Sequence, residues 1–240
     1  MAFETRTQYG SRAQAEAAEI DVGLRQYMLG VYNYMASGLA LTGIVALLLS
    51  SSPEAMQAIF GTPLKWVVML APLGLVFFLG ARLGEMQVST ARGLFWVYAA
   101  LMGASLSSIF LIYTGQSVAQ VFFITAASFG GLSLYGYTTK RNLSAFGSFL
   151  IMGLWGLIIA GLVNMFLQSS ALAFVMSAVG VLVFAGLTAW DTQRIKEMYW
   201  EGDGHDIAAK KSVMGALMLY MDFVNLFLML LQFFGVRRDQ

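Results

Sequence analysis

The sequence contains no cysteine, a single histidine and few charged side chains. Without cysteine, disulfide bonds, thiolate catalysis and cysteine-ligated metal sites are excluded, and the lone His205 excludes any site that needs two histidines. Charged residues make up only 11% of the chain and apolar residues 58%, whereas a soluble domain carries about 25% charged residues. So little charge cannot cover a water-facing surface of 240 residues. The bilayer must therefore be the solvent for most of the chain.

The net charge and the N-terminal segment exclude further classes of protein. A formal net charge of +1 argues against a nucleic-acid partner, because such a partner needs a basic face. Residues 1–27 mix arginines with acidic residues and lack an apolar run ahead of a small-residue cleavage site, so we expect no signal peptide. We expect residues 1–27 to form a polar, alanine-rich helix that serves as a cytoplasmic N-terminal tail.

Long apolar runs fill the rest of the chain. A membrane-spanning helix needs about 20 apolar residues, and these runs are apolar on all sides, unlike the alternating strands of a membrane barrel. We therefore predict an all-α integral membrane protein, with a seven-helix transmembrane domain over residues 28–236 and a C-terminal tail over 237–240. The predicted spans are 28–49, 64–81, 93–113, 118–137, 145–167, 171–190 and a seventh between 213 and 235.

Positive charge is distributed unequally between the loops, and this predicts the orientation. Eleven of the fourteen Lys and Arg residues fall on the side of the N-terminus, so that side is predicted to be cytoplasmic and the C-terminus external. Arg237 and Arg238 do not fit this rule, and a seventh segment that dips into the membrane and returns would place the C-terminus inside as well. The eleven residues are Arg6, Arg12, Arg25, Arg82, Arg92, Lys140, Arg141, Arg194, Lys196, Lys210 and Lys211.

Two aspartates stand out within the apolar runs. Asp191 ends the sixth run, and Asp222 lies inside the seventh with apolar residues on both sides. A carboxylate at mid-bilayer costs about 2.5–3.5 kcal/mol, so such a residue indicates a functional site and needs a partner. Taken alone, Asp191 also fits an ordinary aspartate at the membrane interface.

The two aspartates can meet only if their depths in the membrane match. Asp191 lies about 30 Å from the outer start of helix six, near the inner edge of the membrane. Asp222 would be about 14 Å deep if helix seven entered the bilayer at Val213, but only about 6 Å deep if the embedded part began near Met218. We therefore predict that residues 213–217 lie at the interface and that the seventh helix is short.

Two carboxyl groups that meet in a medium of low dielectric constant constrain each other's ionisation. Ionising both would cost much free energy, so they share one proton. Loss of that proton adds like-charge repulsion between helices six and seven, which makes Asp191 and Asp222 a candidate proton sensor and gate. Two ionised carboxylates with backbone carbonyls also suit Ca²⁺, so the same two residues are a candidate calcium site. No cofactor is required.

Three short segments of the sequence together resemble the motifs of a known protein family. Residues 186–196 read GLTAWDTQRIK, residues 219–227 read LYMDFVNLF, and residues 134–140 read LYGYTTK. They resemble, in that order, the signature, the final helix and the segment after the fourth helix of the Bax inhibitor-1 family, also called the transmembrane BAX inhibitor motif family. The likeness covers residues 23–235 and has a bacterial character.

The resemblance implies a central seventh helix surrounded by the other six, and a pH-sensitive calcium leak across the inner membrane. Asp191 and Asp222 match the family's aspartate pair, which acts as proton sensor and gate. Arg82 matches a basic residue that latches the closed state, although it also fits an ordinary positive-inside residue that reaches to the headgroups. In one departure, a calcium-leaking bacterial member carries a glutamate inside the second helix, whereas this chain has no acidic residue near Ala71.

Two other functions compete with a calcium leak. Some bacterial relatives bind a membrane-anchored ATP-dependent protease and slow it through the N-terminal tail, a role that residues 1–27 would serve. An intramembrane aspartyl protease also uses two aspartates on late helices. Here, however, Asp222 lacks the Gly-x-Gly-Asp context and no Pro-Ala-Leu segment follows it. We therefore predict that the protein is not an enzyme.

Overall fold

Seven helices long and apolar enough to cross a membrane make up most of the computed structural model, which describes the backbone of residues 2–238 and the side chains of residues 22–238. This confirms the predicted fold class, an all-α membrane protein with seven transmembrane helices. The helices are α1 (Ala2–Ser50), α2 (Pro53–Phe60), α3 (Leu64–Arg82), α4 (Val88–Leu106), α5 (Ile109–Ile112), α6 (Gly115–Thr138), α7 (Ser144–Leu167), α8 (Ser170–Glu197) and α9 (His205–Phe234). The short α2 connects the first two spans, and α5 continues the third.

Hydroxyl side chains mark where several helices begin. The side chains of Ser52, Thr114 and Ser169 each accept a hydrogen bond from a backbone N–H in the first turn of α2, α6 and α8. Such a cap satisfies an N–H group that has no partner inside the helix. The polar breaks between the apolar runs of the sequence are therefore also the points where new helices start.

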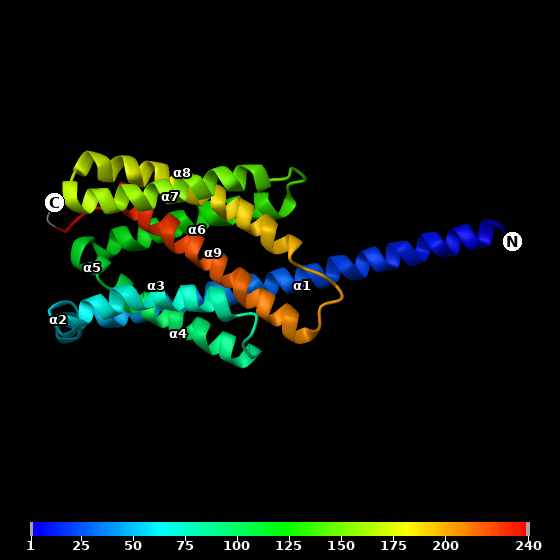
Figure 1. Cartoon of the computed structure of the whole chain (residues 1–240), viewed down its shortest axis with the longest axis horizontal. Coiled ribbons are helices and arrows are strands. Elements are labelled where there is room, and N and C mark those ends of the chain that lie inside the picture. The colour runs from blue at the N-terminus through cyan, green and yellow to red at the C-terminus, as the bar shows by residue number, and fades with distance from the viewer. Residues whose placement is uncertain (1, 239–240) are drawn as a thin grey trace.

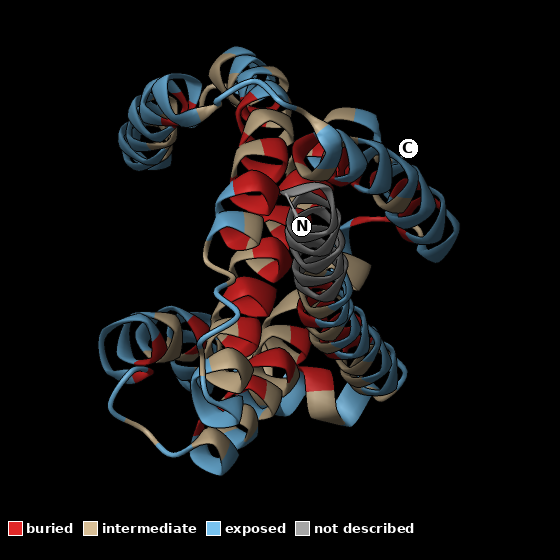
Figure 2. Ribbon diagram, turned by 90° about the vertical axis from the view of Figure 1, so that its right-hand side faces the viewer, coloured by how far each residue is buried: buried red, intermediate tan, exposed pale blue. Residues whose placement is uncertain are grey.

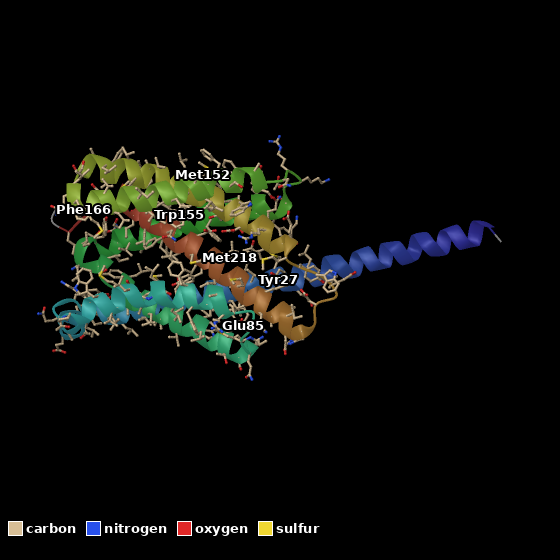
Figure 3. The ribbon with its side chains drawn as sticks, in the orientation of Figure 1. Tyr27, Glu85, Met152, Trp155, Phe166 and Met218 are labelled. Carbon is tan, nitrogen blue, oxygen red and sulfur yellow. The ribbon has the colours of Figure 1, made fainter. Side chains whose placement is uncertain are left out.

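Large apolar side chains cover the outside of the bundle. Met152, Trp155 and Phe166 on α7, labelled in Figure 3, are all exposed. An apolar surface of this extent would favour aggregation in water. In a bilayer it is the surface that meets lipid, as expected for an integral membrane protein.

Helix α9 runs through the middle of the bundle (Figure 1), and the buried residues gather around this central region (Figure 2). It packs against α1, α4, α6 and α8, whereas α3 packs on α4 and α7 packs on α8. The expectation of a ring of six helices therefore needs refinement, because α3 and α7 form an outer layer.

The last helix also differs in length from the expectation. It has 30 residues and begins at His205, eight residues before Val213. Residues 213–217 pack inside the bundle, apart from the partly exposed Met214. The prediction of a short seventh helix was wrong because hydropathy alone does not reveal that the polar start of α9 is also helical.

The C-terminus lies at the end of the bundle opposite the N-terminus (Figure 1). After α9, Arg237 forms an antiparallel bridge with Tyr113, and the N–H of Arg238 donates to the carbonyl of Ile112 at 2.9 Å. These contacts tie the C-terminal segment to the connection between α5 and α6. Helix α9 therefore crosses the bundle once, and the alternative of a segment that dips in and returns is wrong.

Hydroxyl groups join α1, α4 and α9 inside the core. The Thr42 hydroxyl lies 2.8 Å from the carbonyl of Ala99 and 2.9 Å from that of Gly38, and the Tyr220 hydroxyl lies 2.6 Å from Thr42 Oγ1. Because the single Thr42 proton is directed to a carbonyl, Tyr220 must be the donor to Thr42. Gly103 permits this close approach, since a Cβ there would lie 2.6 Å from the Thr42 carbonyl oxygen.

We expect Thr42→Val to lower the free energy of unfolding by about 1–3 kcal/mol, because it leaves the fully buried Tyr220 hydroxyl without a partner. Adding Tyr220→Phe should recover most of this loss, since both polar partners are then gone. The measurement is reversible unfolding in detergent micelles. A double variant as unstable as the sum of the two single variants would contradict the proposed hydrogen bond.

Candidate functional site at the contact of α8 and α9

The antiparallel packing of α8 and α9 brings the two aspartates to nearly the same position along the helix axes. Gly215 on α9 lies against Ile195 on α8, and a Cβ at Gly215 would come within 2.9 Å of the isoleucine side chain. Asp191 lies one turn before Ile195, and Asp222 lies two turns after Gly215. The two carboxyl-bearing positions therefore differ by only about 4.5 Å along the helix axis.

The carboxyl groups of Asp191 and Asp222 lie within hydrogen-bonding reach of each other. The residues are only 9% and 5% exposed, and one oxygen of each, Asp191 Oδ1 and Asp222 Oδ2, is sealed from solvent without a hydrogen-bond partner. Two ionised carboxylates at this place would repel each other and would lack the donors that a buried charge needs. A proton kept by one carboxyl group and donated to the other would remove both problems, and this shared proton stays a prediction.

Besides Asp222, Arg194 is the described side chain whose charge influences Asp191. It lies three residues beyond Asp191 in the last turn of α8, is exposed, and has its guanidinium carbon 5.5 Å from the centroid of the Trp190 ring. A cation at this position favours a negative charge on Asp191. Among the described side chains, the pair thus has an apolar core on one side and Arg194 toward the end of α8.

A chain of hydroxyl groups leads from Asp191's neighbour to the first helix. Thr192 Oγ1 lies 2.9 Å from Ser133 Oγ on α6, and Ser133 Oγ lies 2.6 Å from the Tyr32 hydroxyl on α1. Thr192 also donates to the carbonyl of Thr188 at 2.7 Å. The sequence gives no signal of these linked hydroxyl groups, because Tyr32 and Ser133 lie in apolar runs and only Thr192 belongs to a recognisable motif.

The polar residues that follow Thr192 on α8 form hydrogen bonds with the end of α6 and with the connection between α6 and α7. The Gln193 side chain accepts from the N–H of Leu143 at 2.9 Å and donates to the carbonyl of Arg141 at 2.8 Å. Lys196 donates to the carbonyl of Tyr137 at 2.8 Å. Gln193 and Lys196 therefore hold the end of α8 against two different backbone segments, the 141–143 connection and the end of α6.

Arg82, the predicted latch, does not reach the aspartate pair in this structure. Its guanidinium Nη1 lies 2.7 Å from Glu85 Oε2, and its side chain is 63% exposed. The adjoining turn is held by Lys210, whose ammonium donates to the carbonyl of Gly84 at 3.0 Å. Asp222 lies twelve residues further along α9, about 18 Å away along the axis. The latch role of Arg82 stays a prediction.

The candidate calcium site consists of two carboxyl groups in this structure. Across the residues whose side chains are described, no group of three or more histidine or acidic side chains comes together in a way that would hold a metal ion. Ca²⁺ takes six to eight oxygen ligands. Asp191 and Asp222 would therefore need backbone carbonyls and water to complete a calcium shell, and calcium binding here stays a prediction.

The sequence of this chain is similar to a family profile and to several bacterial proteins. The profile of a family described as "Inhibitor of apoptosis-promoting Bax1" matches residues 24–239, which include both aspartates. Uncharacterized protein RP147 of Rickettsia prowazekii is 52% identical over 219 residues, covering 91% of this chain and 93% of that protein. Inner membrane protein YbhL of Escherichia coli is 47% identical over 219 residues, covering 90% and 94%. An uncharacterized protein of Caulobacter vibrioides is 47% identical over 244 residues, covering 96% and 97%.

Proposed function

Because this chain belongs to the Bax inhibitor-1 family, we propose that it is a pH-sensitive calcium leak channel, gated by the proton that Asp191 and Asp222 share. The protein is a multi-pass inner-membrane protein, as its seven apolar helices and its relative YbhL indicate. The observation that carries the proposal is the buried carboxyl pair between α8 and the central α9. In this view, Ca²⁺ is the transported ion rather than a resident cofactor.

The gating step follows from the charge of the pair. While one proton bridges Asp191 and Asp222, the two helices can stay in contact and the pair stays sealed, which corresponds to the closed state. When the pH rises and that proton leaves, two negative charges face each other in a low dielectric, and α8 and α9 are driven apart. Arg194 and an entering Ca²⁺ are the positive charges that offset this repulsion. Calcium flux should therefore increase as the pH rises.

The direct test is calcium flux through purified protein in liposomes that enclose a calcium indicator. We expect flux above that of protein-free liposomes, and we expect it to grow as the pH is raised on both sides. The control is the same assay with a potassium ionophore, which removes any membrane potential that would limit Ca²⁺ entry. Flux equal to that of protein-free liposomes at every pH would refute the proposed leak.

A second proposed role is the regulation of a membrane-anchored ATP-dependent protease through the N-terminal segment. Helix α1 begins at Ala2, twenty residues before its membrane-length part Val22–Ser50, and projects clear of the bundle (Figure 1). Twenty helical residues extend about 30 Å, which is long enough to reach a partner anchored in the same membrane.

Deletion of residues 2–20 separates the two roles. We expect the protease to co-purify with the full chain and to be lost from the truncated chain, while calcium flux is retained, because the deletion leaves the aspartate pair intact. Protease that co-purifies equally with both chains would show that this segment is not the binding element.

A further inference from the structure

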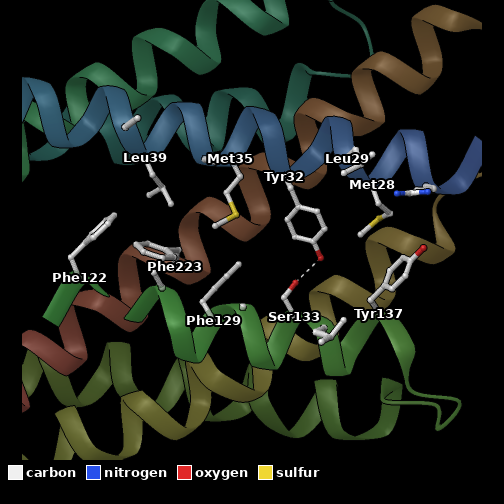
Figure 4. Close-up of a pocket in the computed structure, with 16 residues that line it drawn as sticks. Met28, Leu29, Tyr32, Met35, Leu39, Phe122, Phe129, Ser133, Tyr137 and Phe223 are labelled. Atoms are coloured by element: carbon white, nitrogen blue, oxygen red, sulfur yellow. Dashed lines mark hydrogen bonds between the residues drawn. The ribbon is translucent and has the colours of Figure 1, made fainter. Parts of the chain in front are cut away.

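A long apolar groove runs between α1 and α6 (Figure 4). Its larger part has a volume of about 890 Å³ and is lined by residues of α1 and α6, with Phe223 of α9 beneath them. A second part of about 450 Å³ continues toward the C-terminal end of the bundle. The two parts share Leu39, Ala40, Phe122 and Phe223, so they form one continuous trough.

The larger part of the groove matches one membrane leaflet in length. Its lining on α1 extends from Arg25 to Ala40, which is about 22 Å of helix. Half of a bilayer, headgroup region included, is about 20–22 Å thick. The Phe122 and Phe223 rings, with centroids 5.4 Å apart, mark the inner end of this part near the middle of the membrane. A lipid that enters from the N-terminal side would therefore fit from headgroup to chain end.

Charge is placed at the headgroup end of this trough. Arg25 lines that end, and Lys196 adjoins it through Tyr137, since the Lys196 ammonium lies 5.5 Å from the centroid of the Tyr137 ring. Deeper in the groove, the Tyr32 hydroxyl is already paired with Ser133 at 2.6 Å (Figure 4). The groove is thus positive where phosphate would lie and apolar where hydrocarbon would lie, which is complementary to an anionic phospholipid.

We propose that this groove is a binding site for an anionic phospholipid of the leaflet on the N-terminal side. Its acyl chain lies between α1 and α6 on Phe223 and Phe129, and its headgroup phosphate lies at Arg25. A site of 890 Å³ is within the range of about 300–1,000 Å³ that is typical of pockets for small molecules.

Two adjacent glycines on α6 give a matched test of the groove. Gly130 lines it and Gly131 does not, and a Cβ at either position would meet no atom within 4 Å. The fold should therefore accommodate Gly130→Leu and Gly131→Leu equally, but only the first fills the groove. We propose native mass spectrometry of delipidated full-length protein titrated with phosphatidylglycerol. Gly131→Leu should bind like the original chain, and Gly130→Leu should bind at least tenfold more weakly, whereas equal binding by both would overturn the proposal.

The headgroup contact is tested by charge removal. Arg25→Gln should reduce the preference for phosphatidylglycerol over phosphatidylcholine about fivefold, the value of one basic residue at a membrane surface. Lys140→Gln, which removes an exposed charge outside the groove lining, should leave the preference unchanged. An unchanged preference in Arg25→Gln would overturn the headgroup assignment. Dimers of the delipidated chain that Gly130→Leu disrupts would instead identify the groove as a contact between copies and overturn the lipid site.

Discussion

Replacing Asp222 with asparagine is expected to abolish the pH dependence of calcium flux and to hold the flux at its low-pH level. The amide has nearly the shape of the protonated carboxyl group and can donate a hydrogen bond to Asp191, but it has no proton to lose near neutral pH. Two unit charges about 4 Å apart repel each other by about 4 kcal/mol at an effective dielectric constant of 20. Removing that repulsion should change the ratio of open to closed states by two to three orders of magnitude.

The measurement is the liposome flux assay over a range of pH, with Asp206→Asn as the matched control. Asp206 is an exposed aspartate in the first turn of the same helix, away from the pair, so its variant should keep the original pH response. Asp191→Asn should reproduce the effect of Asp222→Asn, because either change removes one member of the pair. A full pH response in Asp222→Asn would exclude the aspartate pair as the proton sensor.

Gly136→Ala is expected to destabilise the protein by about 2–3 kcal/mol, at the upper end of the usual cost of overpacking. A Cβ at Gly136 on α6 would lie 2.1 Å from the carbonyl oxygen of Ala189 on α8, and 2.9 Å from its carbonyl carbon. These are backbone atoms, so no change of rotamer can relieve the clash, and the two helices must separate. Because Ala189 is two residues before Asp191, the displacement should also disturb the pH response.

The matched control for this prediction is Gly131→Ala, which adds a methyl group to the same helix where a Cβ meets no atom within 4 Å. Its free energy of unfolding should be unchanged or up to about 1 kcal/mol higher, because alanine favours a helix more than glycine does. Unfolding in mixed detergent micelles compares the two variants directly. Equal stabilities would show that α6 and α8 can move apart here at little cost.

Much of the candidate site was predictable from residue type and position. Asp191 and Asp222 are recognisable because a carboxyl group among apolar residues is costly in a bilayer and needs a partner on another helix. The structure brings them together as expected, although their depths match for a reason other than the one that the sequence suggested. The predicted match in depth depended on a short last helix, whereas α8 in fact continues past Asp191 to Glu197 and α9 begins at His205.

Arg82 and the hydroxyl chain show where sequence reasoning reached its limit. The position of Arg82 after an apolar run predicts that it lies at the membrane surface, but not whether it turns toward Glu85 or toward the aspartates. Tyr32 and Ser133 are separated by about a hundred residues, and neither carries a signal of its partner. Such pairs depend on which faces of two helices meet, and helices that are apolar on all sides give no periodic signal of that choice.

The sequence by itself determined that most of the chain lies in a bilayer and how many times the chain spans it. It also determined the orientation expected from loop charge and the two aspartates, Asp191 and Asp222, that need a partner. The spans and the need for a partner follow from the free energy of transferring each segment from water to lipid, and the expected orientation follows from the distribution of Lys and Arg between the loops. The tertiary structure decided that α9 is central and long, that Arg82 bonds Glu85, and that a groove remains between α1 and α6. The choice of neighbouring helices depends on close packing at small residues such as Gly103, Gly136 and Gly215, where the room left by a missing side chain, rather than hydropathy, lets another helix approach.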